Sequence, residues 1–310
     1  MNADGLKWKD EFASAAIIAG ACAWGICDAS PVDSDVVRSM REWIEKGYHG
    51  EMHYLMRHME LKESVESVLP GCRSIVSLAF PYRHELKREA DSLVFSRYAT
   101  GRDYHIVLRE LVKPLCSLIT DAYGGSVRVC VDSAPLAERY YAVKCGLGTL
   151  GRNGMLYVEG YGSWVFLCEI LSTALLPTVS WNDNMDSVSM CGSCRRCIDV
   201  CPGGAILGNG TIDSRRCRSY LTIENRDECL PAEIRLGKRV YGCDICQEVC
   251  PINSDSRQGI AAFVPRDIFR NITKEQLSAI DDETFSTMAT ESAISRISIR
   301  QLKRNADRCE

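Results

Sequence analysis

Hydrophobic and polar positions change their spacing several times along the N-terminal half of the chain. Residues 34–47 carry apolar side chains at helical intervals and end on a glycine, which predicts a helix. Residues 72–82 and 163–172 are short, continuously apolar runs, which predict buried strands. Residues 105–124 return to helical spacing, and residues 127–135 begin as another apolar run. This alternation predicts a domain of α+β or α/β class.

The composition changes after Pro177. The next stretch is rich in cysteine and turn residues, and the last fifty or so residues return to helical spacing. We therefore predict a catalytic domain over residues 1–180, a ferredoxin-like domain over residues 181–257 and a helical C-terminal segment over residues 258–310.

The composition also bears on where the protein acts. The 310 residues have a formal net charge of −4, so a nucleic-acid partner would need local basic patches. The apolar run at 15–27 follows Asp10 and Glu11, where an export signal would be positive, and we interpret it as a helix leading into a strand. No apolar run reaches the roughly 18 residues of a membrane span. We expect a cytoplasmic protein without a membrane partner, in which seventeen cysteines indicate metal or redox chemistry.

Two runs of cysteines give the strongest chemical signal. The first follows C-x2-C-x2-C-x3-C-P, the spacing of bacterial ferredoxins, and comprises Cys191, Cys194, Cys197 and Cys201. The second lacks the first cysteine of that pattern and comprises Cys243, Cys246 and Cys250. Zinc typically uses isolated C-x2-C pairs, whereas two interlocking runs that end in Cys-Pro favour two 4Fe–4S clusters.

In the ferredoxin pattern the fourth cysteine of each run binds the other cluster. Cluster one would then be held by Cys191, Cys194, Cys197 and Cys250. Cluster two would be held by Cys201, Cys243, Cys246 and an eighth cysteine, for which Cys217 and Cys229 are the candidates and Cys217 is favoured. Paired clusters move single electrons, so this region is predicted to be an electron pathway.

A glycine-rich segment mimics a dinucleotide site. It spells G-x-G-x-x-G in Gly146, Gly148 and Gly151. A dinucleotide site needs a strand before these glycines and a helix after them. Here the preceding residues have helical spacing and the following ones are broken by more glycines. We interpret the segment as a tight loop that lets the backbone approach a different, large cofactor.

Longer motifs resemble one family. The segments SRYATGRDYHIVLRE, VDSAPLAERYYAVKCGLGTLGRNG, YGSWVFLCEIL, CRSYLTIEN and YGCDICQEVCPIN are similar, in this order, to the epoxyqueuosine reductase family. Its members reduce epoxyqueuosine to queuosine at the tRNA wobble position with cobalamin and two 4Fe–4S clusters. The resemblance implies a nitroreductase-like cobalamin-binding domain with an appended two-cluster domain. Because the chain stops at Glu310, it also implies the short form without C-terminal helical repeats.

Asp132 is the predicted catalytic residue. It follows a strand-like apolar run and can point into a cleft with a raised pKa, although it could also cap the next helix. In the family, the aspartate of this motif is the proton donor. The resemblance also places twelve residues at the cobalamin: Tyr104, His105, Asp132, Arg139, Gly151, Arg152, Asn153, Leu156, Leu167, Ser219, Asp244 and Ile245.

Residue types alone leave other roles open for some of these. His105 could be a core histidine, Arg139 a solvated helix residue, and Ser219 and Asp244 turn caps. Lys62 stands where many members carry an arginine, which loosens any bidentate contact proposed there.

A tRNA partner requires basic surface. Basic residues concentrate in two places: Arg215, Arg216, Arg218, Arg226, Arg235, Lys238 and Arg239, and then Arg296, Arg300, Lys303 and Arg304. The resemblance implies that they position the anticodon loop, although either run also fits an ordinary solvated face. We further expect a monomer served by an unidentified low-potential electron donor. Two other functions stay open: reduction of a small molecule, as in reductive dehalogenases, and a ferredoxin-type electron carrier.

Overall fold

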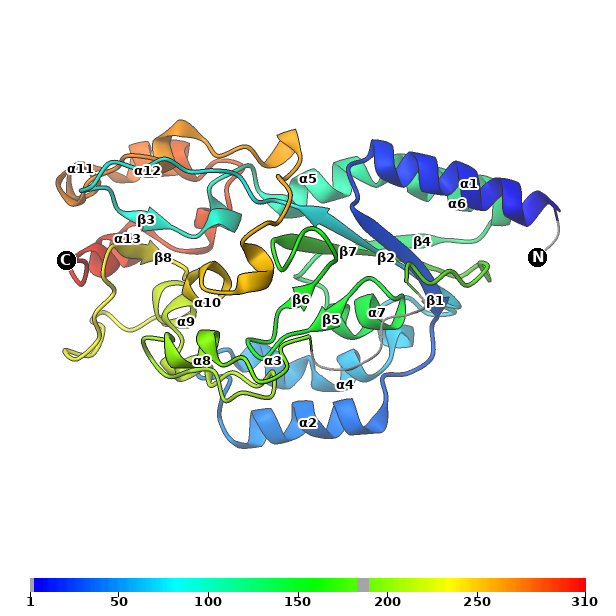
Figure 1. The fold of residues 1–310 in the computed structure, drawn as a ribbon, viewed down its shortest axis with the longest axis horizontal. Helices are drawn as coiled ribbons and strands as arrows, with labels where there is room; N and C mark the ends of the chain where they lie inside the picture. The colour runs from blue at the N-terminus through cyan, green and yellow to red at the C-terminus, as the bar shows by residue number, and fades with distance from the viewer. Residues whose placement is uncertain (1–2, 183–189) are drawn as a thin grey trace.

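A four-stranded antiparallel sheet forms the centre of the larger lobe. The computed structural model describes residues 3–182 and 190–310. The strand order is β1 (Ala23–Asp28), β2 (Ser74–Pro81), β7 (Val165–Ser172) and β4 (Val127–Cys130). Every neighbouring pair is antiparallel. The lobe is therefore α+β, and it lies at one end of an elongated molecule whose termini are far apart (Figure 1).

Helices cover both faces of this sheet (Figure 1). One face packs against α1 (Ala3–Ile18), α5 (Tyr104–Leu111) and α6 (Lys113–Tyr123) through a large hydrophobic cluster. The other face packs against α7 (Glu138–Lys144). Because side chains alternate along a strand, β7 directs Phe166 to the first face and the neighbouring positions to the second.

The second face also carries shorter elements. They are α2 (Ser34–Glu45), α3 (His53–Arg57), α4 (Met59–Glu63) and the hairpin of β5 (Thr149–Leu150) and β6 (Leu156–Tyr157). The hairpin follows α7 directly, so the glycine-rich segment lies between a helix and a hairpin. This arrangement is not the strand–glycine loop–helix unit of a dinucleotide site, and the rejection of the nicotinamide interpretation is confirmed.

The described part of the cysteine-rich region contains three short α-helices, one strand and two 3₁₀ helices. The helices and the strand are α8 (Arg196–Asp199), α9 (Arg218–Ile223), β8 (Arg239–Tyr241) and α10 (Ile245–Glu248), and the 3₁₀ helices are η3 (Ser214–Arg216) and η4 (Pro251–Asn253). Strand β8 pairs in parallel with β3 (Val94–Phe95), which joins this region to the N-terminal part of the chain.

The C-terminal helices are α11 (Lys274–Ala279), α12 (Asp282–Ala289) and α13 (Ile299–Ala306). Capping boxes begin α11 and α13, with the side chains of Thr273 and Ser298 as their N-caps. Buried side chains from β3, α9, β8 and these helices share one hydrophobic cluster. All three predicted regions therefore contribute to this second core.

Two predicted elements differ from the structure. The helix expected over residues 105–124 is two helices that meet at Val112, because Pro114 in the first turn of α6 cannot continue the hydrogen-bond ladder of α5. The strand expected over residues 127–135 ends at Cys130. Over the part of the chain that the structure describes, no helix combines the length and apolarity needed to cross a membrane.

Candidate functional site

Asp132 lies two residues beyond the end of β4, and its carboxylate is held by two side chains of α5. The Tyr104 hydroxyl donates to Oδ2 at 3.0 Å, and the His105 Nε2 lies 3.4 Å from the same oxygen. The other ring nitrogen of His105, Nδ1, lies 2.7 Å from Oδ1 of Asp103. The imidazole thus stands between two carboxylates, and the family-implied residues Tyr104, His105 and Asp132 come together.

The charges of this group depend on one another. Burial lowers the pKa of His105, but the carboxylates of Asp103 and Asp132 outweigh it and raise the value to about 9. His105 is therefore an imidazolium at neutral pH, not a neutral core histidine. The His105 hydrogen bond, helped by Tyr104, lowers the pKa of Asp132 against the effect of burial. The expectation of a raised pKa for Asp132 is thus wrong for this arrangement, because a cation faces the carboxylate.

The expected alternative role of Asp132 as a helix cap is also wrong. Helix α7 begins at Glu138, and the residue before it, Ala137, provides no side-chain cap. Asp132 instead adopts a left-handed backbone conformation with φ of 54°. The carboxylate of Glu138 accepts a hydrogen bond from the Asp132 backbone N–H at 2.5 Å.

Asp132 is exposed, whereas the groups around it are desolvated, and we call this group of residues the Asp132 recess. The Asp132 side chain is 63% exposed. Burial and the charge of Asp132 raise the pKa of Glu138 to about 7, and burial lowers the pKa of Lys62 on α4. Arg139 faces both Asp132 and Glu138, as expected for a residue of the same site, and its guanidinium donates to the carbonyl of Gly154. An accessible acid therefore lies among desolvated charged groups.

A series of aromatic rings leads from this recess towards the cysteine-rich region. Tyr104 stacks on Phe166 with centroids 4.4 Å apart, and Phe166 stacks on Tyr82 at 4.3 Å. Beyond them, the Arg97 guanidinium lies over the Trp164 ring, and the Arg97 backbone N–H donates to Asp244 at 2.8 Å. Asp244 is buried next to Cys243 and is therefore close to the predicted second cluster.

The predicted cluster-one cysteines are neighbours in space. Burial raises the pKa of the Cys197 thiol, and the nearby thiols of Cys191, Cys250 and Cys194 raise it further. Segments more than fifty residues apart are therefore brought together, as crossed ligation requires.

The predicted cluster-two cysteines also gather. Burial and the nearby thiols of Cys243 and Cys217 raise the pKa of Cys246. Cys217 in turn is close to Cys201. Cys229 is exposed and lies near Arg304 instead. The structure thus brings Cys217, and not Cys229, to the other three cysteines.

Both cysteine sets combine thiols from separate segments of the chain. Cys250 joins the first run, and Cys201 and Cys217 join Cys243 and Cys246. This crossed arrangement is the one that paired 4Fe–4S clusters use, whereas zinc typically uses isolated C-x2-C pairs.

The glycine-rich segment packs against the protein itself. A Cβ at Gly148 would lie 2.1 Å from the backbone oxygen of Tyr157, and one at Gly151 would lie 2.5 Å from the Tyr157 ring. A Cβ at Gly146 would meet the Ser180 hydroxyl at 2.3 Å. The expectation that these glycines admit a cofactor is corrected: they let the β5–β6 hairpin pack closely.

The two residues after Gly151 face the cysteine-rich region. Arg152 donates to the backbone carbonyls of Gly208 and Gly192. The buried Asn153 donates to the Tyr157 hydroxyl at 3.1 Å and also hydrogen-bonds to Cys246, whereas Tyr157 hydrogen-bonds to Cys250. Asn153 and Tyr157 therefore lie between one predicted ligand of each cluster.

Four other residues expected at the cobalamin have different surroundings. Leu156 and Leu167 lie together in the hydrophobic cluster under α7, and Leu156 is buried. Ser219 and Ile245 are half-buried and lie beside Cys217 and Cys243, respectively.

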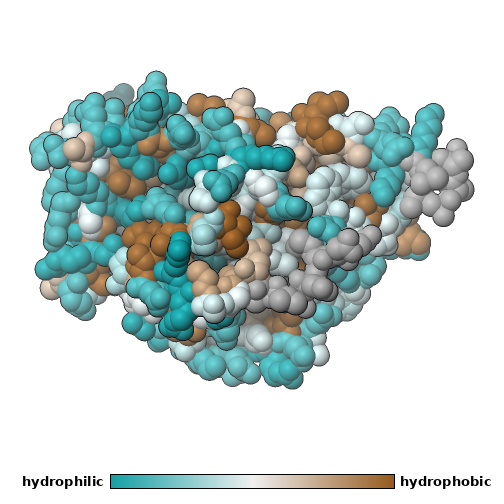
Figure 2. Space-filling view, in the orientation of Figure 1, coloured by the Kyte–Doolittle hydropathy of each residue, from teal (hydrophilic) through white to brown (hydrophobic). Residues whose placement is uncertain are grey.

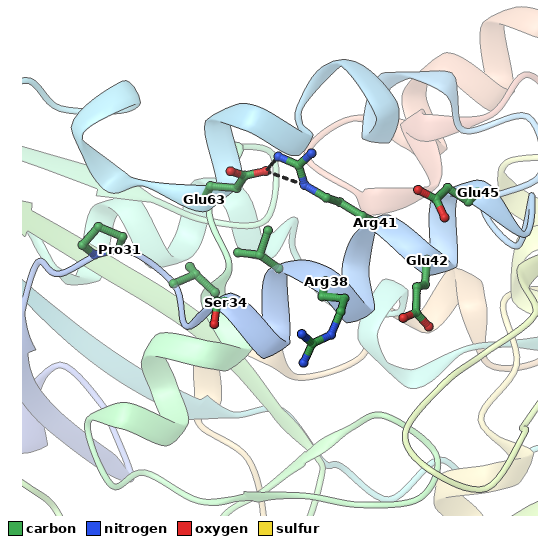
Figure 3. A pocket seen from close by; sticks show the side chains of 9 residues that line it. Pro31, Ser34, Arg38, Arg41, Glu42, Glu45 and Glu63 are labelled. Atoms are coloured by element: carbon green, nitrogen blue, oxygen red, sulfur yellow. Dashed lines mark hydrogen bonds and ion pairs between the residues drawn. The ribbon is translucent and has the colours of Figure 1, made fainter.

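A separate groove of about 620 Å³ lies along α2 (Figure 3). Arg41 pairs with Glu63 across the groove, and Arg38 and Glu42 pair with Asp35 and Lys46, respectively. None of its nine lining residues belongs to the predicted site.

The groups around Asp132 offer a large cofactor both ring surface and polar contacts. Tyr104 and His105 are half-buried, and their rings stack with centroids 4.1 Å apart beside the exposed carboxylate of Asp132. A corrin, which combines a broad ring with a polar amide fringe, fits such surroundings.

Most of the basic residues expected to face tRNA are engaged within the protein. Six pair with acidic side chains: Arg215, Arg235, Lys238, Arg239, Arg296 and Arg300. Arg304 is buried and donates to backbone carbonyls of the 221–227 segment. Figure 2 shows polar residues interrupted by separate hydrophobic patches on the viewed face.

Sequence reasoning missed Asp103, Glu138 and Glu169. Asp103 could have been found from its place two residues before His105, and Glu138 from its position in the VDSAPLAER motif. Glu169 interrupts the apolar run of β7, accepts a hydrogen bond from Ser77 at 3.1 Å, and burial raises its pKa strongly.

Comparisons with known proteins agree with this architecture. Residues 63–133 match the family model "Epoxyqueuosine reductase QueG, DUF1730", and residues 190–253 match "4Fe-4S double cluster binding domain". An epoxyqueuosine reductase of Gloeobacter violaceus is 37% identical over 291 residues, which cover 91% of this chain and 89% of that protein. One of Cyclobacterium marinum is 36% identical, with 91% and 90% covered.

Solved structures are similar over nearly the whole chain. A crystal structure of epoxyqueuosine reductase with an epoxyqueuosine-modified tRNA-Tyr stem loop is 28% identical, with a TM-score of 0.85, and the match covers 97% of this chain and 80% of that one. A Bacillus subtilis epoxyqueuosine reductase, also 28% identical, has a TM-score of 0.83 and the same coverage. In that structure the aspartate-bearing catalytic loop is swung out of the active site.

The fold and the paired cysteine runs define a protein that joins a catalytic α+β lobe to a two-cluster electron-transfer region. The chain belongs to the epoxyqueuosine reductase family.

Proposed function

We propose that this protein reduces epoxyqueuosine to queuosine at the wobble position of tRNA, with Asp132 as proton donor. The reaction consumes two electrons and two protons, converts the epoxide to an alkene and releases its oxygen as water. The observation that carries the proposal is the carboxylate of Asp132, held by Tyr104 and His105 in a recess next to the cysteine-rich region.

The cofactors follow from the family and from the side chains available. Cobalamin would lie against Tyr104 and His105, beside the exposed carboxylate of Asp132. When bound, it supplies a cobalt centre that stores two electrons and acts on carbon. Two 4Fe–4S clusters on the eight cysteines would pass electrons singly from a low-potential donor.

The chain's own residues would manage the proton. Asp132 is a carboxylate at neutral pH because its pKa is lowered, whereas His105 is an imidazolium; His105 can therefore supply the proton that Asp132 passes to the departing oxygen. Tyr104 donates to the same carboxylate oxygen and so fixes its direction. The mobile catalytic loop of the Bacillus subtilis relative supports a role for the loop that bears Asp132.

A tRNA anticodon loop is the proposed partner, because a structural relative binds an epoxyqueuosine-modified stem loop. The wobble base would have to leave its stack to reach the recess. Four of the basic candidates form no ion pair within the described residues and are not buried: Arg216, Arg218, Arg226 and Lys303. Of these, Arg226 donates to the Gln301 side chain and to the Arg296 carbonyl.

Anaerobic purification tests the proposal. The protein should contain about eight irons and bound cobalamin, and should convert epoxyqueuosine in a tRNA stem loop under a strong reductant. Clusters without corrin and without turnover would favour an electron carrier. Corrin with turnover of a halogenated small molecule, and none of the tRNA, would favour the dehalogenase-like function.

A further inference from the structure

The loop that bears Asp132 is held in an unfavourable backbone conformation. Asp132 has φ of 54°, one of two non-glycine residues with positive φ among those described. Left-handed backbone is costly for a residue with a Cβ and persists only where the surroundings enforce it. Something outside Asp132 must therefore stabilise the conformation.

Hydrogen bonds within the loop are too local to do this. The Ser133 N–H donates to the Val131 carbonyl at 2.6 Å, and the Leu136 N–H donates to the Ala134 carbonyl at 2.8 Å. Both bonds close tight turns inside the loop and do not attach it to the rest of the lobe. The bond from the Asp132 N–H to Oε1 of Glu138 does attach it, because Glu138 is the first residue of α7.

Helix α7 is a firm support. Its residues Tyr141 and Ala142 are fully buried, and the Tyr141 hydroxyl donates to the Ser30 carbonyl at 3.2 Å. The Lys144 ammonium lies 3.0 Å from Asp28 at the other end of the helix. A side chain fixed on α7 can thus restrain the backbone of Asp132. The other attachments of the loop are the buried side chains of Val131 and Leu136 and the contacts of the Asp132 carboxylate with α5.

We infer that Glu138 is a positioning residue: its carboxylate binds the Asp132 N–H and keeps the 131–137 loop in the conformation that points Asp132 at Tyr104 and His105. We call this hydrogen bond the Glu138 clamp. Its role in catalysis rests on the proposed function, whereas the hydrogen bond itself can be measured without turnover. A hydrogen bond to a charged carboxylate is among the stronger ones, which suits a strained backbone.

The groups around Glu138 make the clamp sensitive to pH. Lys62 and Arg139 face it as cations, Asp132 and Glu169 as acids, Tyr104 as a phenol, and Cys130 and Cys168 as thiols. Burial, followed by the charge of Asp132, raises the pKa of Glu138 to about 7. The carboxylate form, and with it the stronger bond, therefore develops as the pH rises through about 7.

Hydrogen exchange of the anaerobically purified, cluster-containing protein tests the clamp. In Glu138→Ala, the peptide covering residues 131–137 should exchange about ten- to a hundredfold faster than in the wild type, as expected for loss of a bond to a charged group. Glu138→Gln keeps an acceptor and should be intermediate. Glu66→Ala is the matched control, because the Glu66 carboxylate accepts the Gly71 N–H at 2.9 Å, and it should leave this peptide unchanged.

The remaining readouts separate positioning from a purely structural role. Corrected for intrinsic exchange, protection of the peptide should rise between pH 6 and 8 in the wild type and stay flat in Glu138→Gln. With the stem-loop substrate, Glu138→Ala should lower kcat about tenfold or more at unchanged KM, and Glu138→Gln should recover most of it. Wild-type exchange in Glu138→Ala overturns the clamp, and a flat wild-type pH profile overturns its pH sensitivity.

Full kcat with a loosened loop overturns the positioning role. An inactive wild type with the expected exchange pattern refutes the proposed function and leaves the clamp standing.

Discussion

The Asp132 recess and the cysteine-rich region differ in how their ionisable groups are arranged. Around Asp132, charges of both signs alternate: Asp103, His105 and Asp132 form one series, and Lys62 and Arg139 face Glu138. In the cysteine-rich region, burial and neighbouring thiols raise the pKa values of Cys197, Cys243 and Cys246, although Arg239 and Arg218 lie near Cys243.

The difference shows what each region is prepared to receive. The positive and negative charges of the recess already offset one another, so the recess can hold and move a proton without a large rearrangement. The raised pKa values favour protonated thiols. A bound cluster would take these protons and hold the sulfurs together as its ligands. Damage to one region should therefore leave the other intact, which the following variants test.

Removal of a cluster-two ligand should have the largest effect. Cys217→Ala should reduce the iron content from about eight to about four per chain and abolish measurable turnover, because electrons could no longer pass through the second cluster. Iron analysis, low-temperature electron paramagnetic resonance and stem-loop assays measure these changes. Cys229→Ala is the matched control and should retain both clusters, since Cys229 lies exposed near Arg304. A normal iron content in Cys217→Ala would reassign the eighth ligand.

Asp132→Asn should have the next largest effect. Loss of the proton donor should lower turnover by about 10²–10⁴-fold, the range for general acid catalysis. Iron content and affinity for the stem loop should match the wild type, because both depend on other residues. Asp28→Asn is a suitable control: it removes a carboxylate 3.0 Å from Lys144, at the opposite end of α7. Equal turnover in Asp132→Asn and the wild type would exclude Asp132 as the donor.

The two regions were not equally predictable from the sequence. The cysteines of each run lie close together in the sequence, so seven of the predicted cluster ligands follow from a known spacing pattern. Only the choice of Cys217 over Cys229 depended on the folded structure. The main strands were also predictable, because β2 and β7 are short and mostly apolar. Their antiparallel order was not, since it depends on pairing between distant segments.

The recess depends on contacts that leave no local pattern. Residues of α5, α7 and the loop after β4 meet only in the folded lobe, so the cation beside Asp132 and the resulting direction of its pKa were missed. The glycine loop was misread for the same reason: its close neighbour, Tyr157, is brought back by a hairpin.

The smallest expected effect is the pH dependence of turnover set by His105. It is also the sharpest test of whether the charges around Asp132 offset one another. Its folded pKa of about 9 lies above the ordinary value, so its interaction with Asp103 and Asp132 is complete below about pH 6.5 and is lost as the pH rises through about 9. Wild-type turnover should therefore decline above about pH 9.

In His105→Asn the proton must come from Asp132 alone. Turnover at neutral pH should fall about tenfold, equivalent to roughly 1.5 kcal/mol for one hydrogen bond to a charged group, and the alkaline decline should begin at least two pH units lower. Stem-loop kinetics across pH 5–10, with thermal unfolding measured in parallel, separate this effect from loss of the fold. A variant that keeps the decline near pH 9 would show that another group supplies the proton, and the charge series around Asp132 would then serve stability rather than catalysis.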